Sequence, residues 1–162
     1  MPNYRRNRAP GGTYFFTVTL ADRRSQALIE HVALLRKAVC RVRTARPFHI
    51  DAWVVLPDHL HAVWTLPEGD ADYSSRWREI KKAFTRTVGG SVWQRGFWEH
   101  TLRDERDCAA HIDYVHINPL KHGLVARVAD WPYSSFHRAV AQGLYPVDWT
   151  GDGAADIDVG DP

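Results

Sequence analysis

The hydrophobic residues of this chain recur with two periods: an alternation typical of strands and a three- or four-residue spacing typical of helices. Residues 13–20 are rich in β-branched and aromatic side chains and are predicted to form a first strand. Residues 47–66 alternate through two more strands, with a tight turn predicted at Pro57-Asp58. Each strand of this hairpin is expected to place its apolar residues on one face: Phe48, Ile50, Ala52, Val54 and Leu56 in the first, and Leu60, Ala62, Trp64 and Leu66 in the second.

Helical spacing marks three longer segments. The first spans residues 25–44 and is amphipathic. The second is expected to run from a serine cap at position 74 or 75 to residue 88, where two glycines stop it. The third is expected over residues 104–118, because Pro119 disfavours helical geometry at the residue before it.

The remaining segments complete the order of elements. Residues 92–102 are expected to form a short strand, a turn at Arg95-Gly96 and another strand, and residues 135–142 a short last helix. Strand, helix, strand, strand, helix, strand, helix is the order of a ferredoxin-like α+β fold with an antiparallel sheet. We therefore expect one domain over residues 1–149 and a disordered acidic tail at residues 150–162.

The charge distribution indicates a polyanionic partner. The net charge is only +2, but residues 139–162 contain five aspartates and no lysine or arginine, so the rest of the chain carries +7. Residues 1–9 contain Arg5, Arg6 and Arg8 and no acid, and are expected to form a flexible basic arm that follows a phosphate backbone. A disordered terminus without this role is the alternative.

Basic residues also accompany the predicted helices. Arg78, Lys81 and Lys82 are expected on the exposed side of the second helix, where they are candidates for contacts with DNA phosphates. Solvated basic side chains would give the same pattern. Lys121, just after the third predicted helix, is well placed to meet a phosphate.

Two features that the sequence lacks restrict the class of protein. Cys40 and Cys108 lack the spacing of a metal-binding or disulfide pair. No apolar run is long enough for a signal peptide or a membrane span. Both features favour a cytoplasmic protein with reduced thiols.

Two histidines in the hairpin are candidates for metal ligands. His59 and His61 are two apart on the predicted strand, so both project from the face opposite Leu60 and Ala62. Two neighbouring imidazoles form half of a metal site. The alternative is a pair of ordinary strand histidines satisfied by hydrogen bonds, which the spacing alone does not exclude.

The third predicted helix carries a candidate nucleophile. Cys108, Ile112 and Val115 form its apolar stripe, and a polar stripe beside it consists of Asp107, His111, Tyr114 and Asn118. The Asn118 amide therefore lies one turn, roughly 6 Å, beyond the Tyr114 phenol. The alternative is a tyrosine at the margin of the core whose hydroxyl contacts water.

These residues lie in blocks that resemble a known family. The blocks are residues 57–61 (PDHLH), 93–100 (WQRGFWEH) and 114–125 (YVHINPLKHGLV). Together they resemble the REP-associated tyrosine transposases, which belong to the single-tyrosine HUH transposases. The likeness continues, in order and up to about Trp149, through residues 4–6 (YRR), 11–18 (GGTYFFTV) and 131–137 (WPYSSFH).

The resemblance implies a HUH endonuclease fold and the cleavage and rejoining of single-stranded DNA at hairpin-forming repetitive extragenic palindromes. Tyr114 would attack a phosphodiester and form a 5′-phosphotyrosine. A divalent metal, Mg²⁺ or Mn²⁺, held by His59, His61 and Asn118, would polarise the phosphate. Related insertion-sequence enzymes have Gln in place of Asn118. The resemblance also implies an immobile, monomeric protein associated with the nucleoid.

Three further residues are candidates for supporting the site. Glu99 and His100 lie on the last predicted strand, within the second of the similar blocks. His111 lies one turn before Tyr114 on the same helix face, where it is a candidate for accepting the phenol proton.

Two other classes of function remain open. A ferredoxin-like sheet can also bind single-stranded RNA without catalysis, although no RNP-type aromatic pattern is evident. A metal- or histidine-dependent phosphoesterase acting on small nucleotides is the second alternative. Histidine-triad hydrolases require a third alternating histidine, but this chain has Val63 there, and the paired H-x-T or H-x-S motifs of two-histidine phosphoesterases are absent from the sequence.

Overall fold

A four-stranded antiparallel sheet of order β2-β3-β1-β4 lies at the centre of the computed structural model, which describes residues 8–151 and residue 157. The strands are β1 (Thr13–Thr19), β2 (His49–Val55), β3 (His59–Thr65) and β4 (Trp98–Thr101). The helices are α1 (Ala27–Glu30), α2 (Val32–Ala45), α3 (Tyr73–Val88), α4 (Glu105–Lys121), the 3-10 helix η1 (Val128–Asp130) and α5 (Phe136–Ala141). The ferredoxin-like α+β fold predicted from the element order is confirmed.

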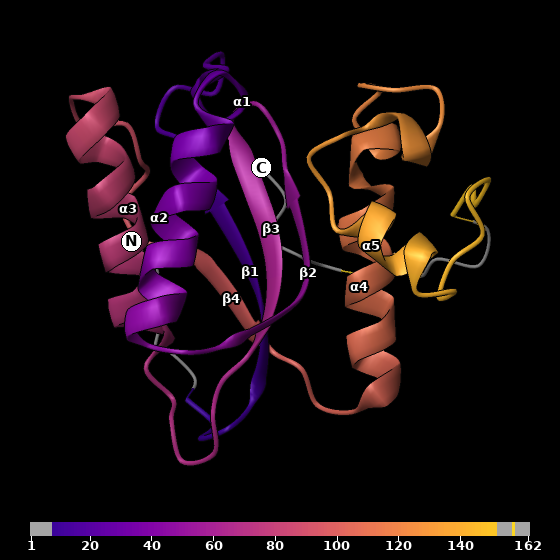
Figure 1. Ribbon diagram of the computed structural model, residues 1–162, viewed down its shortest axis with the longest axis horizontal. Helices are drawn as coiled ribbons and strands as arrows, with labels where there is room; N and C mark the ends of the chain where they lie inside the picture. The colour runs from indigo at the N-terminus through magenta and orange to yellow at the C-terminus, as the bar shows by residue number, and fades with distance from the viewer. Residues whose placement is uncertain (1–7, 152–156, 158–162) are drawn as a thin grey trace.

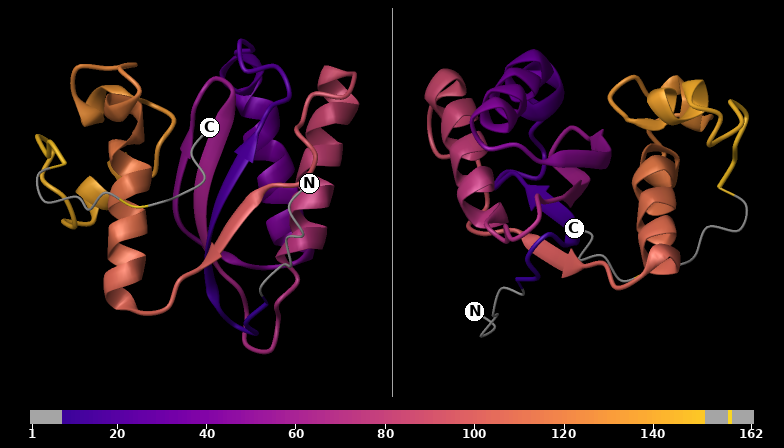
Figure 2. Two further views of the ribbon diagram at one scale, coloured as in Figure 1. Left: turned by 180° about the vertical axis from the view of Figure 1, so that it is seen from behind. Right: turned by 60° about the horizontal axis from the view of Figure 1, so that its bottom comes forward.

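Helices cover both faces of the sheet. α2 and α3 lie side by side on one face, and α4 lies on the other with α5 beside it (Figure 1). Two further views show the same separation, with the sheet between the two helical layers (Figure 2). Each face therefore buries its own hydrophobic cluster.

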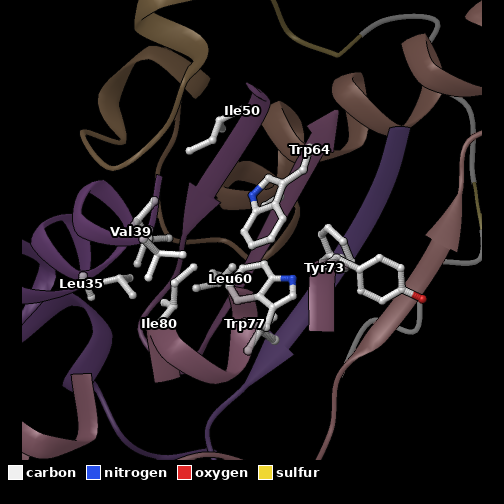
Figure 3. Packing of buried hydrophobic residues seen from close by; sticks show 14 of the residues in the cluster. Leu35, Val39, Ile50, Leu60, Trp64, Tyr73, Trp77 and Ile80 are labelled. Atoms are coloured by element: carbon white, nitrogen blue, oxygen red, sulfur yellow. The ribbon is translucent and has the colours of Figure 1, made fainter. Parts of the chain in front are cut away.

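The larger cluster fills the space between the sheet and the α2–α3 layer (Figure 3). Trp64 of β3 stacks on Trp77 of α3, with ring centroids 4.2 Å apart and planes inclined by 13°. Phe16 of β1 packs edge-on against both indoles. This aromatic packing holds α3 on the sheet and leaves the opposite face for α4.

The smaller cluster joins the sheet to α4. Its buried members include Phe15 of β1, Val54 of β2 and Val63 of β3, together with Tyr114 and Val115 of α4. The side chains of a strand alternate between its two faces, which is why Phe15 and Phe16 belong to different clusters.

The prediction that one face of β2 carries all its apolar residues is wrong. Phe48 and Ile50 belong to the α2–α3 cluster, whereas Ala52, Val54 and Leu56 belong to the α4 cluster. The register shifts between Ile50 and Ala52, because a bulge there inserts an extra residue and reverses the alternation. The prediction for β3 is confirmed, since Leu60, Ala62, Trp64 and Leu66 all belong to the α2–α3 cluster.

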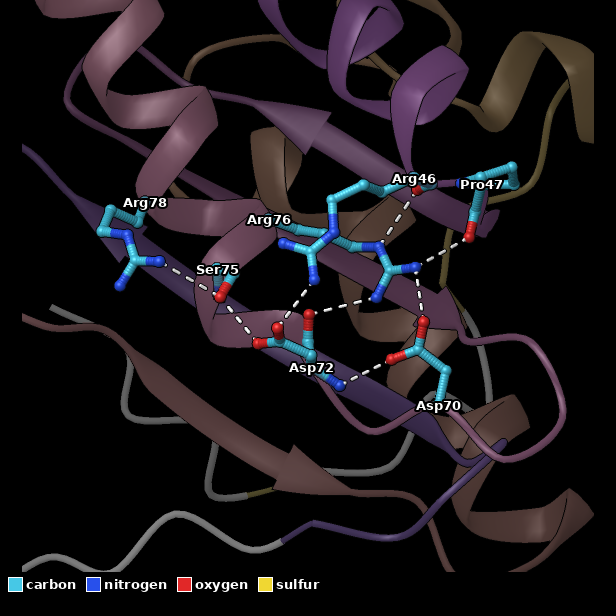
Figure 4. A network of polar contacts seen from close by, with 7 residues as sticks. All are labelled: Arg46, Pro47, Asp70, Asp72, Ser75, Arg76 and Arg78. Atoms are coloured by element: carbon cyan, nitrogen blue, oxygen red, sulfur yellow. Dashed lines mark hydrogen bonds and ion pairs between the residues drawn. The ribbon is translucent and has the colours of Figure 1, made fainter.

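The start of α3 is held by a network of charged groups (Figure 4). Asp72 caps the helix by accepting a hydrogen bond from the Ser75 backbone N–H, so the predicted serine cap is wrong. Arg76, which is 2 % exposed, donates to the Asp70 carboxylate and to the carbonyls of Arg46 and Pro47. The network ties α3 to the connection between α2 and β2.

Other element boundaries also differ from prediction. The predicted helix over residues 25–44 is divided at His31 into α1 and α2. Between residues 92 and 102 the only strand is β4, and Trp93 makes a single bridge to Leu20. α4 continues through Pro119 to Lys121, because a proline in the last turn removes one backbone donor and leaves the preceding turns intact.

Two predictions fall partly outside the described residues. Arg5 and Arg6 of the expected arm lie there, as do most residues of the expected tail, so the division into a domain of residues 1–149 and a tail stays a prediction. Among the described residues, no helix has the length and apolar character required to cross a membrane.

Candidate functional site

The two histidines of β3 face the α4 layer and are buried. His59 is 2 % exposed and His61 is fully buried. Nδ1 of His61 lies 2.8 Å from Oγ1 of Thr17 on β1, and Nδ1 of His59 lies 2.9 Å from Oδ1 of Asp58. Both rings are thus oriented through Nδ1, which makes Nε2 the nitrogen suited to bind a metal.

α4 packs over β2 and β3 so that its polar stripe meets these histidines. The ring of Tyr114 lies 5.4 Å from that of His61, and the ring of His122, two turns further on, lies 5.2 Å from that of His59. Asn118 lies between Tyr114 and His122 on the same stripe. The sequence-predicted nucleophile, histidines and amide therefore share one interface between two layers.

The buried amide of Asn118 fits a ligand. Asn118 is fully buried, and among the described residues neither its oxygen nor its nitrogen has a hydrogen-bond partner. An unsatisfied buried polar group costs about 1–3 kcal/mol, so its retention calls for an explanation. Two imidazole nitrogens and one amide oxygen form a donor set that suits a divalent metal ion.

Lys121 lies beside the candidate nucleophile. Tyr114 is 4 % exposed, and the Lys121 ammonium donates to its hydroxyl over 3.3 Å while lying 4.7 Å from the ring centroid. The ammonium thus places a positive charge beside the phenol oxygen. The sequence predicts a phosphate contact for Lys121. In the structure, the Lys121 ammonium lies next to the hydroxyl of the candidate nucleophile, Tyr114.

Asp107, His100 and His111 form a cluster at the other end of the polar stripe. Asp107 Oδ2 lies 3.1 Å from His100 Nε2, and the two imidazoles stack with centroids 4.8 Å apart. Burial lowers the pKa of His111, although its hydrogen bond to the Asp107 carbonyl acts in the opposite direction. Burial alone would raise the pKa of Asp107, but hydrogen bonds from the Arg103 backbone and His100 lower it.

The structure does not bring Glu99 to the site. Glu99 pairs with Phe16, whereas His100 pairs with Phe15, so the two side chains lie on opposite faces of the sheet. Glu99 lies on the side of Tyr14, whose pKa is raised by burial and, to a smaller extent, by the Glu99 charge. The expectation that Glu99 supports the site does not agree with this placement, because neighbouring strand residues alternate in direction.

The predicted DNA-contact residues of α3 lie on the face away from Tyr114. Arg78 and Lys82 are exposed there. Lys81 donates to the carbonyls of Gln94 and Gly96, so its ammonium already holds the loop before β4. Arg8, the first described residue, is exposed at the start of the chain.

Sequence reasoning missed three residues that shape the site. Thr17 and Asp58 orient the histidines, and His122 contacts His59. Asp58 directly precedes His59 in the PDHLH block, so the sequence could have indicated its contact with that histidine. The contact of Thr17 with His61 could be found only from the register of β1 with β3. A cavity of about 300 Å³ opens beside the site, and its lining includes Arg23, Arg24, Asp58, His59 and His122.

A ferredoxin-like sheet with paired histidines opposite a helical tyrosine defines the class of single-tyrosine HUH nucleases. Comparison with known proteins places the chain within that class. It is 58% identical to the REP-associated tyrosine transposase of Escherichia coli (strain K12), over 94% of this chain and 93% of the relative. A Haemophilus influenzae protein assigned provisionally to the same family is 42% identical, over 94% of this chain and 95% of that protein.

A solved structure supports the same assignment. A REP-associated tyrosine transposase bound to a REP hairpin superposes with a TM-score of 0.96 and 56% identity, covering 100% of this chain and 98% of that one. A scan against protein-family models finds no match. The chain belongs to the REP-associated tyrosine transposases.

Proposed function

We propose that this transposase cleaves and rejoins single-stranded DNA beside hairpins of the repetitive extragenic palindrome type, with Tyr114 as nucleophile. Family membership and the relative bound to a REP hairpin support the substrate. The observation that carries the proposal is the position of the Tyr114 ring, 5.4 Å from His61 and on the same stripe as the unsatisfied Asn118 amide. This arrangement unites a nucleophile with a metal-binding donor set.

The chemistry follows from that juxtaposition. The Tyr114 oxygen forms a bond to phosphorus while the bond from phosphorus to the 3′ oxygen breaks. The 5′ phosphate stays on the protein, the released 3′ oxygen takes up a proton, and attack by a 3′ hydroxyl reverses the step. The phenol proton passes to solvent, and Lys121, 3.3 Å from the phenol oxygen, stabilises the phenolate that remains.

His59, His61 and Asn118 are the residues that would hold the divalent metal, Mn²⁺ or Mg²⁺. When bound there, the metal supplies Lewis-acid polarisation of the scissile phosphate. Thr17 and Asp58 keep the two rings oriented toward that task. Chelation is expected to abolish cleavage and to leave most hairpin binding intact, because binding rests on phosphate and base contacts.

The partner we propose is a hairpin of single-stranded DNA in the nucleoid, bound by a monomer. Arg23 and Arg24 line the cavity beside His59. Their guanidinium groups are suited to hold the phosphates of the strand that enters the site. Arg23 also forms an ion pair of 2.6 Å with Asp58, which links this strand-binding side to the orientation of His59.

The proposal is tested with Tyr114→Phe, which removes one oxygen and little packing. The wild type incubated with hairpin DNA and Mn²⁺ is expected to give a denaturant-resistant complex whose DNA-linked peptide contains Tyr114. The variant is expected to bind the hairpin with unchanged affinity and to form neither product nor adduct. Tyr133→Phe, which alters a tyrosine whose ring packs against Trp131, serves as the matched control and should retain full activity.

Normal cleavage by Tyr114→Phe, or an adduct that maps to another tyrosine, would overturn the assignment. A wild type that binds the hairpin tightly but never cleaves it with Mn²⁺ or Mg²⁺ would instead support a non-catalytic binding module. The histidine variants His59→Ala and His61→Ala separate these outcomes further, since a binding module has no need of either ring.

A further inference from the structure

Three side chains with metal-binding atoms meet where β4 joins α4, apart from the histidines of β3. His100 comes from β4, and Asp107 and His111 come from the first turns of α4. One ligand atom from each lies within 4.8 Å of the other two. The imidazoles of His100 and His111 stack nearly parallel, with planes inclined by 17°, and the Asp107 carboxylate lies at the edge of both.

This cluster is separate from the candidate catalytic metal site. The ring of Phe15 stands between them, with its centroid 5.5 Å from that of His61 and 5.0 Å from that of His111. The metals of a two-metal catalytic site are about 3.5–4 Å apart and share a substrate oxygen. A buried phenyl ring between the two groups excludes such sharing, so a cation in this cluster has a different role.

We propose that His100, Asp107 and His111 bind a second divalent cation, of the Zn²⁺ type, that clamps the start of α4 to β4. Two imidazoles and one carboxylate form the ligand set of Zn²⁺ sites that have three protein ligands and a water in the fourth position. Their burial is graded: the side chain of His111 is 4 % exposed, that of Asp107 12 % and that of His100 33 %, which leaves one open side for entry and for the water.

Binding requires the His100 ring to rotate, because two stacked, nearly parallel imidazoles do not direct their nitrogen lone pairs at one point. Ligand atoms around a tetrahedral Zn²⁺ lie ~3.3 Å apart, given bonds of about 2.0–2.1 Å. Oδ2 of Asp107 lies 3.1 Å from His100 Nε2, and Oδ1 of the same carboxylate lies 3.3 Å from His111 Nδ1. Closing the remaining gap between the two imidazoles falls to His100, whose side chain is the most exposed of the three. His111 Nδ1 exchanges its hydrogen bond with the Asp107 carbonyl for the cation.

The place of the three ligands in the fold indicates what such a clamp would do. β4 and α4 are connected by residues 102–104 alone, and Tyr114 lies one turn beyond His111 on the same face of α4. A cation that joins His100 to α4 restrains the helix that carries the nucleophile. The proposal concerns stability and cation binding, so it stands or falls independently of strand cleavage.

The experiment uses full-length protein without an affinity tag, in a His59→Ala/His61→Ala background that removes the other pair of imidazoles. Zn²⁺ is titrated by calorimetry, and Co²⁺ serves as a spectroscopic probe whose visible bands report its coordination. One site per chain is expected, together with a higher melting temperature in Zn²⁺ than in chelator. Adding Asp107→Asn to this background is expected to reduce Zn²⁺ affinity at least tenfold and to abolish the temperature shift.

Two more variants keep the result interpretable. His100→Gln alters the most exposed of the three ligands and should also lose the site while keeping the metal-free melting temperature. Glu105→Gln, an exposed acid in the same turn of α4, is the matched control and should bind Zn²⁺ normally. Absence of a Zn²⁺ site in the double-histidine background would refute the proposal and leave the cluster a hydrogen-bonded network only. Binding that neither Asp107→Asn nor His100→Gln weakens would refute it equally.

Discussion

Hydrogen bonds at Nδ1 help to orient the candidate metal ligands. His61 is oriented by Thr17 on β1, and His59 by Asp58 in the turn before β3. Thr17 and Asp58 can affect metal binding without contacting a substrate. Outer partners of metal-binding histidines typically change metal affinity or activity 10–100-fold when they are replaced.

The Thr17→Val substitution tests whether the hydrogen bond to His61 affects metal binding. The substitution keeps the shape of the side chain and removes the oxygen 2.8 Å from His61 Nδ1. We expect ~10-fold or greater weakening of Mn²⁺ affinity, measured by titration of Mn²⁺ in the cleavage assay. Thr13→Val, on the same strand but bonded to Thr65, is the control and should leave Mn²⁺ affinity unchanged. Equal effects of both substitutions would assign Thr17 a purely structural role.

Lys121→Met removes the charge beside Tyr114 and preserves much of the aliphatic stem. A hydrogen bond to a charged group contributes about 1.5–3 kcal/mol, so the cleavage rate at saturating DNA is expected to fall roughly 10- to 100-fold. Lys37→Met, an exposed lysine on α2, should change the rate little. If only the affinity for DNA falls and the saturated rate is kept, Lys121 binds phosphate and does not assist the phenol.

For single residues, the sequence predicted the face of a strand on which a side chain lies, but not the distant residues with which that side chain forms hydrogen bonds. The shared face of His59 and His61 follows from alternation within one strand and is confirmed. The burial of Arg76 has no local signal, because its acceptors Arg46 and Pro47 lie some thirty positions away in the chain. Such distant pairings are fixed by tertiary packing and leave no local pattern.

Among the elements, α4 has contacts on both of its sides. One side faces the sheet, and the other carries His116, which is 2 % exposed. Nε2 of His116 lies 2.8 Å from the Ser135 hydroxyl, whose oxygen accepts a hydrogen bond from the Trp53 backbone of β2. Because the oxygen accepts from Trp53, the Ser135 hydrogen is available to His116, which favours a neutral imidazole as acceptor.

This buried imidazole predicts acid sensitivity. Burial, and next the charge of Arg138, lower the pKa of His116 to about 4. In the unfolded chain, histidine takes up a proton near pH 6.5, so the unfolded state binds more protons than the folded state below that pH. The stabilisation is complete above pH 6.5 and is lost as the pH falls from 6.5 to about 4, by at most ~3 kcal/mol.

His116→Gln is expected to reduce this dependence. Urea unfolding at pH 7, 6 and 5 should show a smaller loss of unfolding free energy in the variant than in the wild type. Some dependence remains, because burial also lowers the pKa of His111. His49→Gln, an exposed histidine, is the control and should leave the slope unchanged. Identical slopes for His116→Gln and wild type would contradict the prediction.

Element boundaries were predicted less well than element types. The strands and helices that carry the site have the predicted type, but the bulge in β2 and the extension of α4 past Pro119 were missed. Both depend on what the element packs against: Ala52 and Val54 meet α4, and Pro119 itself is buried. Local propensity carries no information about these neighbours.

On the scale of the whole molecule, basic groups lie on both sides of the sheet. Lys121, Arg23 and Arg24 surround the candidate site, whereas Arg78 and Lys82 lie on the outer side of α3. A hairpin that reaches both groups must extend around an edge of the sheet. The basic arm predicted at residues 1–9 precedes β1, the strand that carries Thr17.

The arm prediction is best tested by deleting residues 2–7. Ala9 should be kept, because its backbone N–H donates to the Tyr14 hydroxyl over 2.7 Å and its carbonyl accepts from the same hydroxyl. The melting temperature should then stay unchanged. Hairpin affinity is expected to fall, and the slope of log affinity against log salt to decrease by up to about 0.9 for each phosphate that the arm neutralises in the wild type. Unchanged affinity and slope would leave the arm without a role in binding.

The division of the site between two layers has a consequence for protein synthesis. The ribosome makes the strand that carries His59 and His61 well before α4, which carries Tyr114. A nascent or prematurely terminated chain that ends before residue 114 holds both histidines but lacks Tyr114, the proposed nucleophile. It also exposes the apolar face formed by Phe15, Val54 and Val63, which recruits chaperones and proteases. Under the proposed function, an incomplete chain therefore cannot cut DNA, and the surface that it exposes is the one that α4 covers in the finished protein.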